Sequence, residues 1–282
     1  MRIFVSIASY RDPQLSDTVY SLFANATLPC RVVVGIYNQL DTVDMMRTNK
    51  VSTVSNHRLS WKLFPAALKR VARANTHVEE VDHLSAGGPL YARQALISTF
   101  DEQIKSCDIF FQIDSHIDFV AGWDVLVIDA LFQTPDWSRS VLSHYPPSKQ
   151  QMISGDNRVP QMSVAIPCTR YPEITTFKAR LVEAPSTPVQ SIGLAAGCLA
   201  FHTSLIPLYP TERFDGLFQG EEFLLAQTFK MNSVKTYAFP RVVCTHEYNR
   251  TGFMIWEDHT NFLQREAKAV KRLTKYLKSM TD

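Results

Sequence analysis

The chain has 282 residues, 45% of them apolar and 20% charged, and its net charge is +2 at pH 7. Its 17 Phe, 10 Tyr and 4 Trp exclude a largely disordered chain, and the near-neutral charge argues against a dedicated nucleic-acid-binding protein. The basic excess is local, because residues 265–278 carry six basic side chains against one acidic side chain. We therefore expect a folded protein with a basic C-terminal segment.

The cysteines and the apolar runs indicate the compartment. Five cysteines, at positions 30, 107, 168, 198 and 244, are widely spaced without a CxxC pair, which argues against a disulfide framework and a zinc ribbon. No stretch resembles a signal peptide or reaches the ~18 apolar residues of a membrane span. These features predict a cytoplasmic protein without stable membrane insertion.

Strand and helix patterns alternate through the first half of the chain. Short apolar runs predict strands at 2–8, 31–37 and 108–114, and we expect a further strand at 77–84. Helical spacing predicts helices at 15–23, 91–106 and 123–132. Residues 40–75 give no clear pattern. This order predicts an α/β single domain with a Rossmann-type, mostly parallel sheet flanked by helices.

The second half has a different composition. Seven of the 15 prolines lie between Pro146 and Pro188, which predicts loops and short edge strands there. Further on we expect strands at 192–202 and 235–239 and a helix at 221–229. Residues 262–280 predict an amphipathic helix whose apolar stripe is Leu263, Ala267, Val270, Leu273 and Leu277.

The sharpest chemical feature is the end of the strand at 108–114. Asp114 and His116 flank one residue, so in an extended segment both side chains project to the same side. Ligands bind beyond the carboxyl ends of parallel strands, and a carboxylate with an imidazole suits Mn²⁺, Fe²⁺ or Zn²⁺. The alternative is a strand-ending Asp that caps a turn, followed by a surface His.

Three other segments carry candidate functional groups. Gly87–Arg93 is a glycine-rich turn before a helix that could hold a diphosphate, with Arg93 adding charge, or a simple loop–helix junction. Glu221 and Glu222 follow Gly220 at a helix start, where acidic residues are also common caps. His246 ends an apolar run and is a candidate third metal ligand, or a structural histidine.

Taken together, these motifs resemble one family. Residues 6–13 (SIASYRDP), 87–93 (GGPLYAR), 112–116 (QIDSH), 122–124 (GWD), 195–197 (AAG), 220–222 (GEE) and 246–250 (HEYNR) occur in one order. This set resembles the GlcNAc-transferase family typified by cytoplasmic hydroxyproline-modifying N-acetylglucosaminyltransferases, which is similar in its DxH site to the mucin-type polypeptide N-acetylgalactosaminyltransferases. The resemblance implies a GT-A-like fold, a UDP-sugar donor, Mn²⁺ or another divalent cation, and retention of the anomeric configuration.

The resemblance also implies roles for single residues. Asp114, His116 and His246 would hold the metal, and Ser9, Tyr10, Arg11, Arg93 and Asp114 would lie around the nucleotide. Glu221, Glu222 and Arg250 would act on the donor, the glutamates by positioning sugar hydroxyls and Arg250 by binding phosphate. The stretch Ala226–Phe229 departs from the Arg-x-Trp of the family, which leaves the donor sugar open.

This interpretation predicts a catalytic domain over residues 1–256 and a basic amphipathic helix over 257–282. Within the domain, residues 1–145 would bind nucleotide and metal, and residues 146–256 would bind the donor sugar and the acceptor. The acceptor would be a hydroxyl group on a protein or glycan, and a nucleic-acid acceptor stays open. The alternatives are a non-haem Fe(II) oxygenase that uses Asp114, His116 and His246, and a non-catalytic nucleotide-sugar-binding module.

Overall fold

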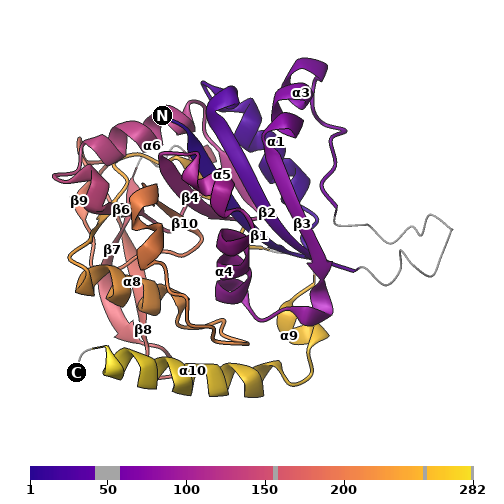
Figure 1. Ribbon diagram of the computed structural model, residues 1–282. Coiled ribbons are helices and arrows are strands. Elements are labelled where there is room, and N and C mark those ends of the chain that lie inside the picture. The colour runs from indigo at the N-terminus through magenta and orange to yellow at the C-terminus, as the bar shows by residue number, and fades with distance from the viewer. Residues whose placement is uncertain (42–57, 155–157, 250–252, 281–282) are drawn as a thin grey trace, which may run out of the picture.

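The computed structural model describes residues 1–41, 58–154, 158–249 and 253–280 (Figure 1). Within these ranges the main sheet has eight strands in the order β3-β2-β1-β4-β10-β6-β11-β9. Its first four strands are parallel neighbours, namely β1 (Ile3–Tyr10), β2 (Val32–Leu40), β3 (Thr76–Asp82) and β4 (Ile109–Asp114). This mixed α/β domain with a mostly parallel sheet confirms the predicted fold class.

Helices cover both faces of the parallel strands. Ile3, Val5 and Ile7 of β1 pack in a core with α1 (Leu15–Ala24) and α6 (Trp123–Phe132). Phe4 points to the opposite core, with α4 (Pro89–Thr99) and α8 (Glu221–Met231). Because β1, β2 and β4 are buried on both faces, they are largely apolar, and this is why the sequence predicted them, whereas β3, at the edge of the sheet, is polar and partly exposed.

The second half of the sheet runs partly in the opposite direction. β10 (Cys198–His202) is antiparallel to both β4 and β6 (Ser140–Ser143), and β11 (Lys235–Ala238) joins β6 to β9 (Val189–Gln190). The strand predicted at 192–202 is therefore shorter than expected. Its first half is irregular, and there the Ala195 backbone N–H and carbonyl hydrogen-bond to the Ser143 hydroxyl instead of to a neighbouring strand.

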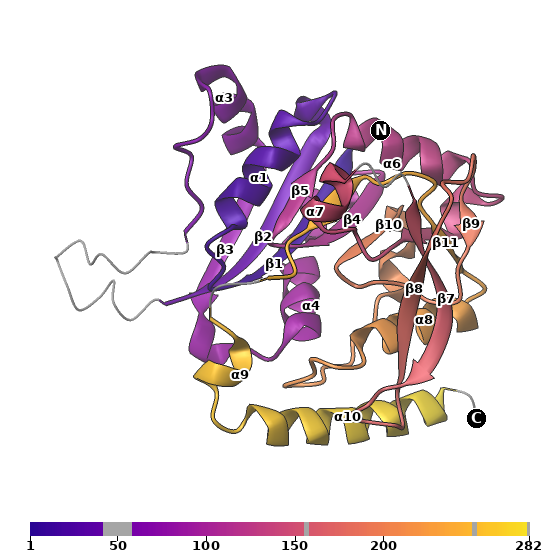
Figure 2. The same ribbon diagram turned by 180° about the vertical axis from the view of Figure 1, so that it is seen from behind.

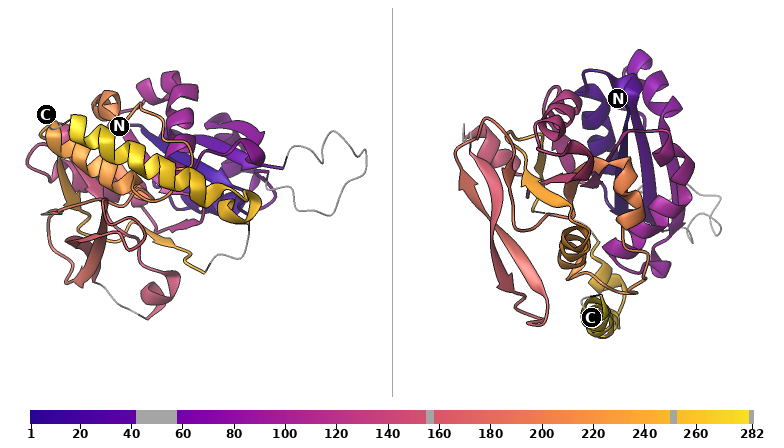
Figure 3. Two further views of the ribbon diagram at one scale, coloured as in Figure 1. Left: turned by 90° about the horizontal axis from the view of Figure 1, so that it is seen from below. Right: turned by 60° about the vertical axis from the view of Figure 1, so that its left-hand side comes forward.

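The proline-rich segment is more regular than the loops and short edge strands that we expected. β7 (Val159–Pro167) and β8 (Thr175–Val182) form a long antiparallel hairpin beside the main sheet (Figures 2 and 3). Pro160 and Pro167 lie near the two ends of β7, where proline disturbs the ladder least. Side-chain burial on one face, including Met162 and Phe177, holds the hairpin against the domain.

Smaller elements complete the fold. The helix predicted at 91–106 is interrupted at Phe100 into α4 and α5 (Asp101–Lys105). The remaining α-helices and strands of the described residues are α3 (Ala66–Ala74), β5 (Ile117–Phe119), α7 (Lys149–Ile153), β12 (Cys244–His246) and α9 (Ile255–Asp258).

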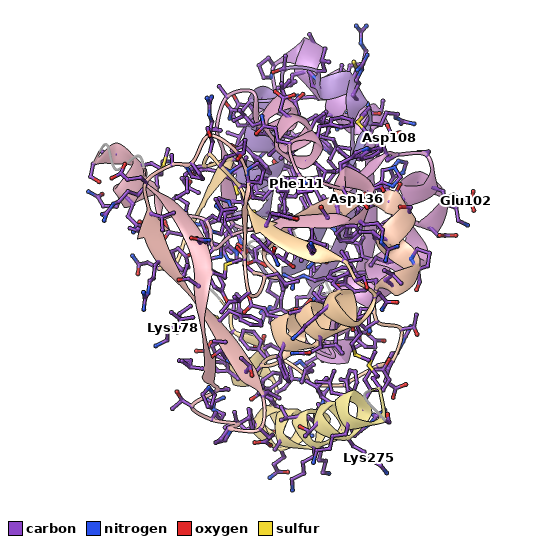
Figure 4. All side chains as sticks on the ribbon, turned by 90° about the vertical axis from the view of Figure 1, so that its left-hand side faces the viewer. Glu102, Asp108, Phe111, Asp136, Lys178 and Lys275 are labelled. Carbon is purple, nitrogen blue, oxygen red and sulfur yellow. The ribbon has the colours of Figure 1, made fainter. Side chains whose placement is uncertain are left out.

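The C-terminal helix α10 (Phe262–Ser279) runs along α8 (Figure 1). Val270 and Leu273 of the predicted apolar stripe are buried, but its first residue is not. Leu263 is 55% exposed, whereas Glu266 is only 1% exposed. The Glu266 carboxylate accepts hydrogen bonds from the Tyr171 hydroxyl (3.0 Å) and the Gln219 backbone N–H (3.0 Å), which explains its burial. Lys275, on the outer side, points away from the domain (Figure 4). No described helix is long and apolar enough to span a membrane.

Candidate active site

A cavity of about 470 Å³ opens at the carboxyl ends of β1 and β4. Its walls come from both halves of the chain, with Ala8, Tyr10, Arg93 and residues 114–116 on one side and residues 196–197, 218–223 and His246 on the other. Such an edge is the usual ligand site of a parallel α/β sheet, and the volume suits a ligand larger than a few atoms.

The three predicted metal ligands meet in this cavity. Asp114 ends β4, and β12 pairs with β5 so that His246 lies opposite Ile117 and next to His116. His246 Nε2 is 3.3 Å from Asp114 Oδ2, and the two imidazole ring centres are 4.5 Å apart. One ligand atom from each residue lies within 4.8 Å of the others, which leaves room for one ion between them. A carboxylate with two imidazoles suits Mn²⁺, Fe²⁺ or Zn²⁺.

Asp12 orients this set, although the sequence analysis gave it no role. His116 Nδ1 lies 2.8 Å from Asp12 Oδ2, and the Ser115 hydroxyl donates to the same oxygen at 2.6 Å. Burial would raise the pKa of Asp12, but the hydrogen bond and charge of His116, together with the hydrogen bonds from Ser115 and the Gln14 backbone, lower the pKa. A carboxylate on Nδ1 fixes the imidazole tautomer and leaves Nε2 free for a metal. The sequence contained one signal for this role of Asp12, namely its position: Asp12 lies just after β1, and Asp114 ends β4.

Arg93, in the wall of the cavity, forms ion pairs with two carboxylates. It donates from Nη2 to Asp114 Oδ1 at 2.7 Å and from Nη1 to Glu221 Oε2 at 2.5 Å, and it is only 4% exposed. Burial would raise the pKa of Asp114, but the hydrogen bond from His246 and the charge of Arg93 bring it below its usual range. Burial raises the pKa of Glu221 despite Arg93. Arg93 therefore fixes the Asp114 carboxylate, with Oδ2 left facing His246.

Glu222 is held by neutral partners. It accepts hydrogen bonds from the Tyr145 hydroxyl and, at 3.1 Å, from the Ala196 backbone N–H. Burial raises its pKa to about 7, against the opposing effect of the Tyr145 hydrogen bond. Tyr145, which the sequence analysis did not select, follows β6 in the segment that begins the proline-rich region.

Gly197 allows the Asp114 carboxylate to sit against the backbone of the AAG segment. A Cβ atom at this position would lie 2.2 Å from Asp114 Oδ2. Any other residue would have to displace that carboxylate. Glycine is therefore required by close approach, not by its backbone angles.

The predicted nucleotide loop is only partly at the cavity. Tyr10 lines it and donates to Asp258 Oδ2 at 2.7 Å, while Arg11 binds Asp258 at 2.8 Å and stacks 3.4 Å from the centre of the Phe253 ring. Ser9 is fully buried and does not line the cavity, because it points to the other face of β1. Arg250 lies outside the described residues.

Comparisons with known proteins identify the family and the fold. Residues 2–282 match the model of the family described as Glycosyltransferase (GlcNAc). No curated protein matches the sequence. The fold is similar to that of GalNAc-T7 solved with UDP, GalNAc and Mn²⁺, with a TM-score of 0.56 and 12% identity over 96% of this chain and 48% of that chain. It is also similar to S. aureus TarS in complex with UDP-GlcNAc, with a TM-score of 0.50 and 14% identity over 96% of this chain and 66% of that chain. This chain thus spans about half the length of the GalNAc-T7 chain.

Proposed function

This chain belongs to the glycosyltransferase family described as Glycosyltransferase (GlcNAc), and on that premise we propose that it transfers N-acetylglucosamine from UDP-GlcNAc to a hydroxyl acceptor with retention of configuration. The observation that carries the proposal is the convergence of Asp114, His116 and His246 on one cavity beyond β1 and β4. The α/β sheet and the family also favour a glycosyltransferase over an Fe(II) oxygenase.

The metal set fits a divalent cation, with Mn²⁺ as our choice. Asp114 Oδ2 and His246 Nε2 already face one another, and Asp12 fixes the tautomer of His116. A cation bound there would neutralise the charge that develops on the UDP leaving group. Arg93 and Asp12 keep the ligands in place before the donor binds.

The donor would lie along the cavity, with its nucleotide near Tyr10 and its sugar near Glu221 and Glu222. Glu222 presents a carboxylate that can accept a hydrogen bond from a sugar hydroxyl. Arg250, from the same motif as His246, is our candidate for an additional phosphate contact.

If configuration is retained, the state of the carboxylates around the cavity favours same-face attack over attack by an enzyme nucleophile. Asp114, Glu221 and Glu222 are the acidic residues that line it in the described ranges, and each is already engaged by Arg93, Tyr145 or His246. None is placed as a free nucleophile. We therefore favour attack on the same face as departure. The bond from the anomeric carbon to phosphate breaks, the acceptor oxygen bonds to that carbon, and the acceptor proton passes to the leaving phosphate oxygen.

The acceptor would enter between the hairpin and the aromatic rim. Thr175 and Thr176 of β8 line the cavity, as do Phe218 and Trp256. This mixture of hydroxyl and aromatic side chains suits a protein or glycan acceptor. A cytoplasmic location remains part of the proposal, supported by five cysteines that are all free thiols in the structure.

The test is release of UDP from UDP-GlcNAc, UDP-GalNAc, UDP-glucose and UDP-galactose, with and without Mn²⁺ and a chelator. We expect UDP-GlcNAc to be preferred, chelator to stop turnover, and Asp114→Asn to lower the rate by about 10³-fold or more, because a metal contributes several kcal/mol to the transition state. NMR of the anomeric proton of the product checks retention. Binding of UDP-GlcNAc without turnover under every condition would favour the non-catalytic module instead.

A further inference from the structure

A second group of metal-binding side chains lies behind the candidate active site. His144 directly follows β6, Cys198 begins β10 and Cys244 begins β12. One ligand atom of each lies within 4.8 Å of the others, and all three side chains are fully buried. The chain separations of 54 and 46 residues hide this group from any search for short cysteine motifs.

The histidine in this group lacks hydrogen-bond partners. Neither Nδ1 nor Nε2 of His144 has a partner, although both atoms are buried. Buried polar atoms are normally paired, so an imidazole with both nitrogens unpaired requires an explanation. Burial lowers its pKa to about 3, so the ring is neutral and offers a lone pair to a metal.

The spacing of the two sulfurs fits a shared ion. Cys198 Sγ and Cys244 Sγ are 3.7 Å apart. Two thiolates that bind one zinc ion at about 2.3 Å lie roughly 3.8–4.0 Å apart, whereas a disulfide needs about 2.05 Å. The sulfurs, which form an S–H···S contact as thiols, are also close to the separation that a metal requires and far from that of a disulfide.

We propose that His144, Cys198 and Cys244 bind a soft d¹⁰ cation, Zn²⁺ or Cu⁺, in an enclosed site separate from the cavity. On binding, the two thiols release their protons and the sulfurs and one imidazole nitrogen bond to the ion. With Zn²⁺, two thiolates and a neutral imidazole give no net charge, which suits a fully buried place. Thiolate ligands also disfavour Mn²⁺, so this site would not bind the Mn²⁺ that is expected at Asp114.

The proposed ion would cross-link the ends of β6, β10 and β12 behind the candidate active site. Cys198 follows Gly197, which contacts the Asp114 carboxylate, and Cys244 lies two residues before His246. An ion tying β6, β10 and β12 together would thus hold Gly197 and His246 in position. Its role is structural, and it does not depend on which sugar the protein transfers.

The first experiment uses Cd²⁺ as the probe. The full-length protein is refolded with Cd²⁺ under reducing conditions, with excess Mn²⁺ to fill the other site, and ultraviolet thiolate-to-cadmium charge transfer is titrated. We expect one equivalent of Cd²⁺ to give the absorption in the wild type, and Cys198→Ser and Cys244→Ser each to lose it. Cys107→Ser, which changes another buried cysteine, should retain it.

Other results would overturn the site. These are no charge-transfer absorption in the wild type, absorption that survives both substitutions, or a mass showing that Cys198 and Cys244 are joined in a disulfide after reducing purification. Should the serine variants not fold, X-ray absorption on wild-type protein from zinc-supplemented culture decides: sulfur neighbours at about 2.3 Å support the site, and only nitrogen and oxygen neighbours refute it. None of these measurements uses UDP-sugar turnover, so the site and the proposed function can fail separately.

Discussion

The carboxylates on the two edges of the candidate active site, one formed by the ends of β1 and β4 and the other by the start of α8, have opposite pKa shifts. On the first edge, Asp12 and Asp114 are paired with His116 and Arg93, and the pKa of each carboxylate is lowered. On the second edge, Glu222 has only a phenol and a backbone N–H as partners, and its pKa is raised. An edge of fixed charges suits a cation and a diphosphate, and an edge of nearly neutral groups suits a sugar. The difference therefore supports the proposed direction of the donor in the cavity, with the diphosphate at the first edge and the sugar at the second.

Arg93→Met tests the link between the edges and should have the largest effect on stability. Methionine fills similar space but leaves the buried Glu221 without its cation, as well as removing one partner of Asp114. Breaking a buried pair in this way costs about 3–5 kcal/mol of the free energy of unfolding. The cost should shrink as the pH falls, because an unpaired Glu221 becomes protonated. Urea denaturation in chelator, at several pH values, measures both effects.

The control for this prediction is Arg272→Ala, which breaks a surface pair with Glu212. Exposed pairs contribute about 1 kcal/mol or less. Equal losses in the two variants would contradict the structural role of Arg93.

Asp12→Asn tests the charge-bearing edge without removing a metal ligand. Loss of the carboxylate that orients His116 should weaken Mn²⁺ binding by about 10–100-fold, and higher Mn²⁺ should restore turnover. Calorimetric titration with Mn²⁺ gives the affinity. The matched control is Asp118→Asn, which changes an exposed carboxylate paired with Lys149 and should bind Mn²⁺ normally. Unchanged affinity in the Asp12 variant would mean that His116 needs no such partner.

Glu222→Gln tests the nearly neutral edge and should have the smallest effect of the three substitutions, with the loss confined to pH values above about 7. If the Glu222 carboxylate accepts a sugar hydroxyl, kcat/KM for the wild type should rise as the pH increases through about 7. The glutamine variant should lack this inflection. Tyr145→Phe removes a hydrogen bond that lowers the pKa, so its inflection should move to higher pH. An inflection near pH 7 that survives in the glutamine variant would assign it to another group.

Local pattern explains what could be predicted about the site. Asp114 ends a strand that is apolar because it is buried on both faces, and His116 follows two residues later, so their position at the ligand edge follows from sequence. The role of Asp12 could not be predicted, because an acidic residue between a strand and a proline is equally typical of a turn. The burial of Glu266 on α10 escaped too, because its partners Tyr171 and Gln219 come from distant segments.

By itself, the sequence determined the parallel half of the sheet, the helices on its faces and the order of the family's motifs, because each depends on residues close together in the chain. Tertiary structure alone decided the hairpin of β7 and β8, the pairing of β5 with β12 that brings His246 to His116, and the meeting of His144 with two cysteines. Those contacts join segments tens of residues apart. Their energies depend on packing and burial that no local periodicity records.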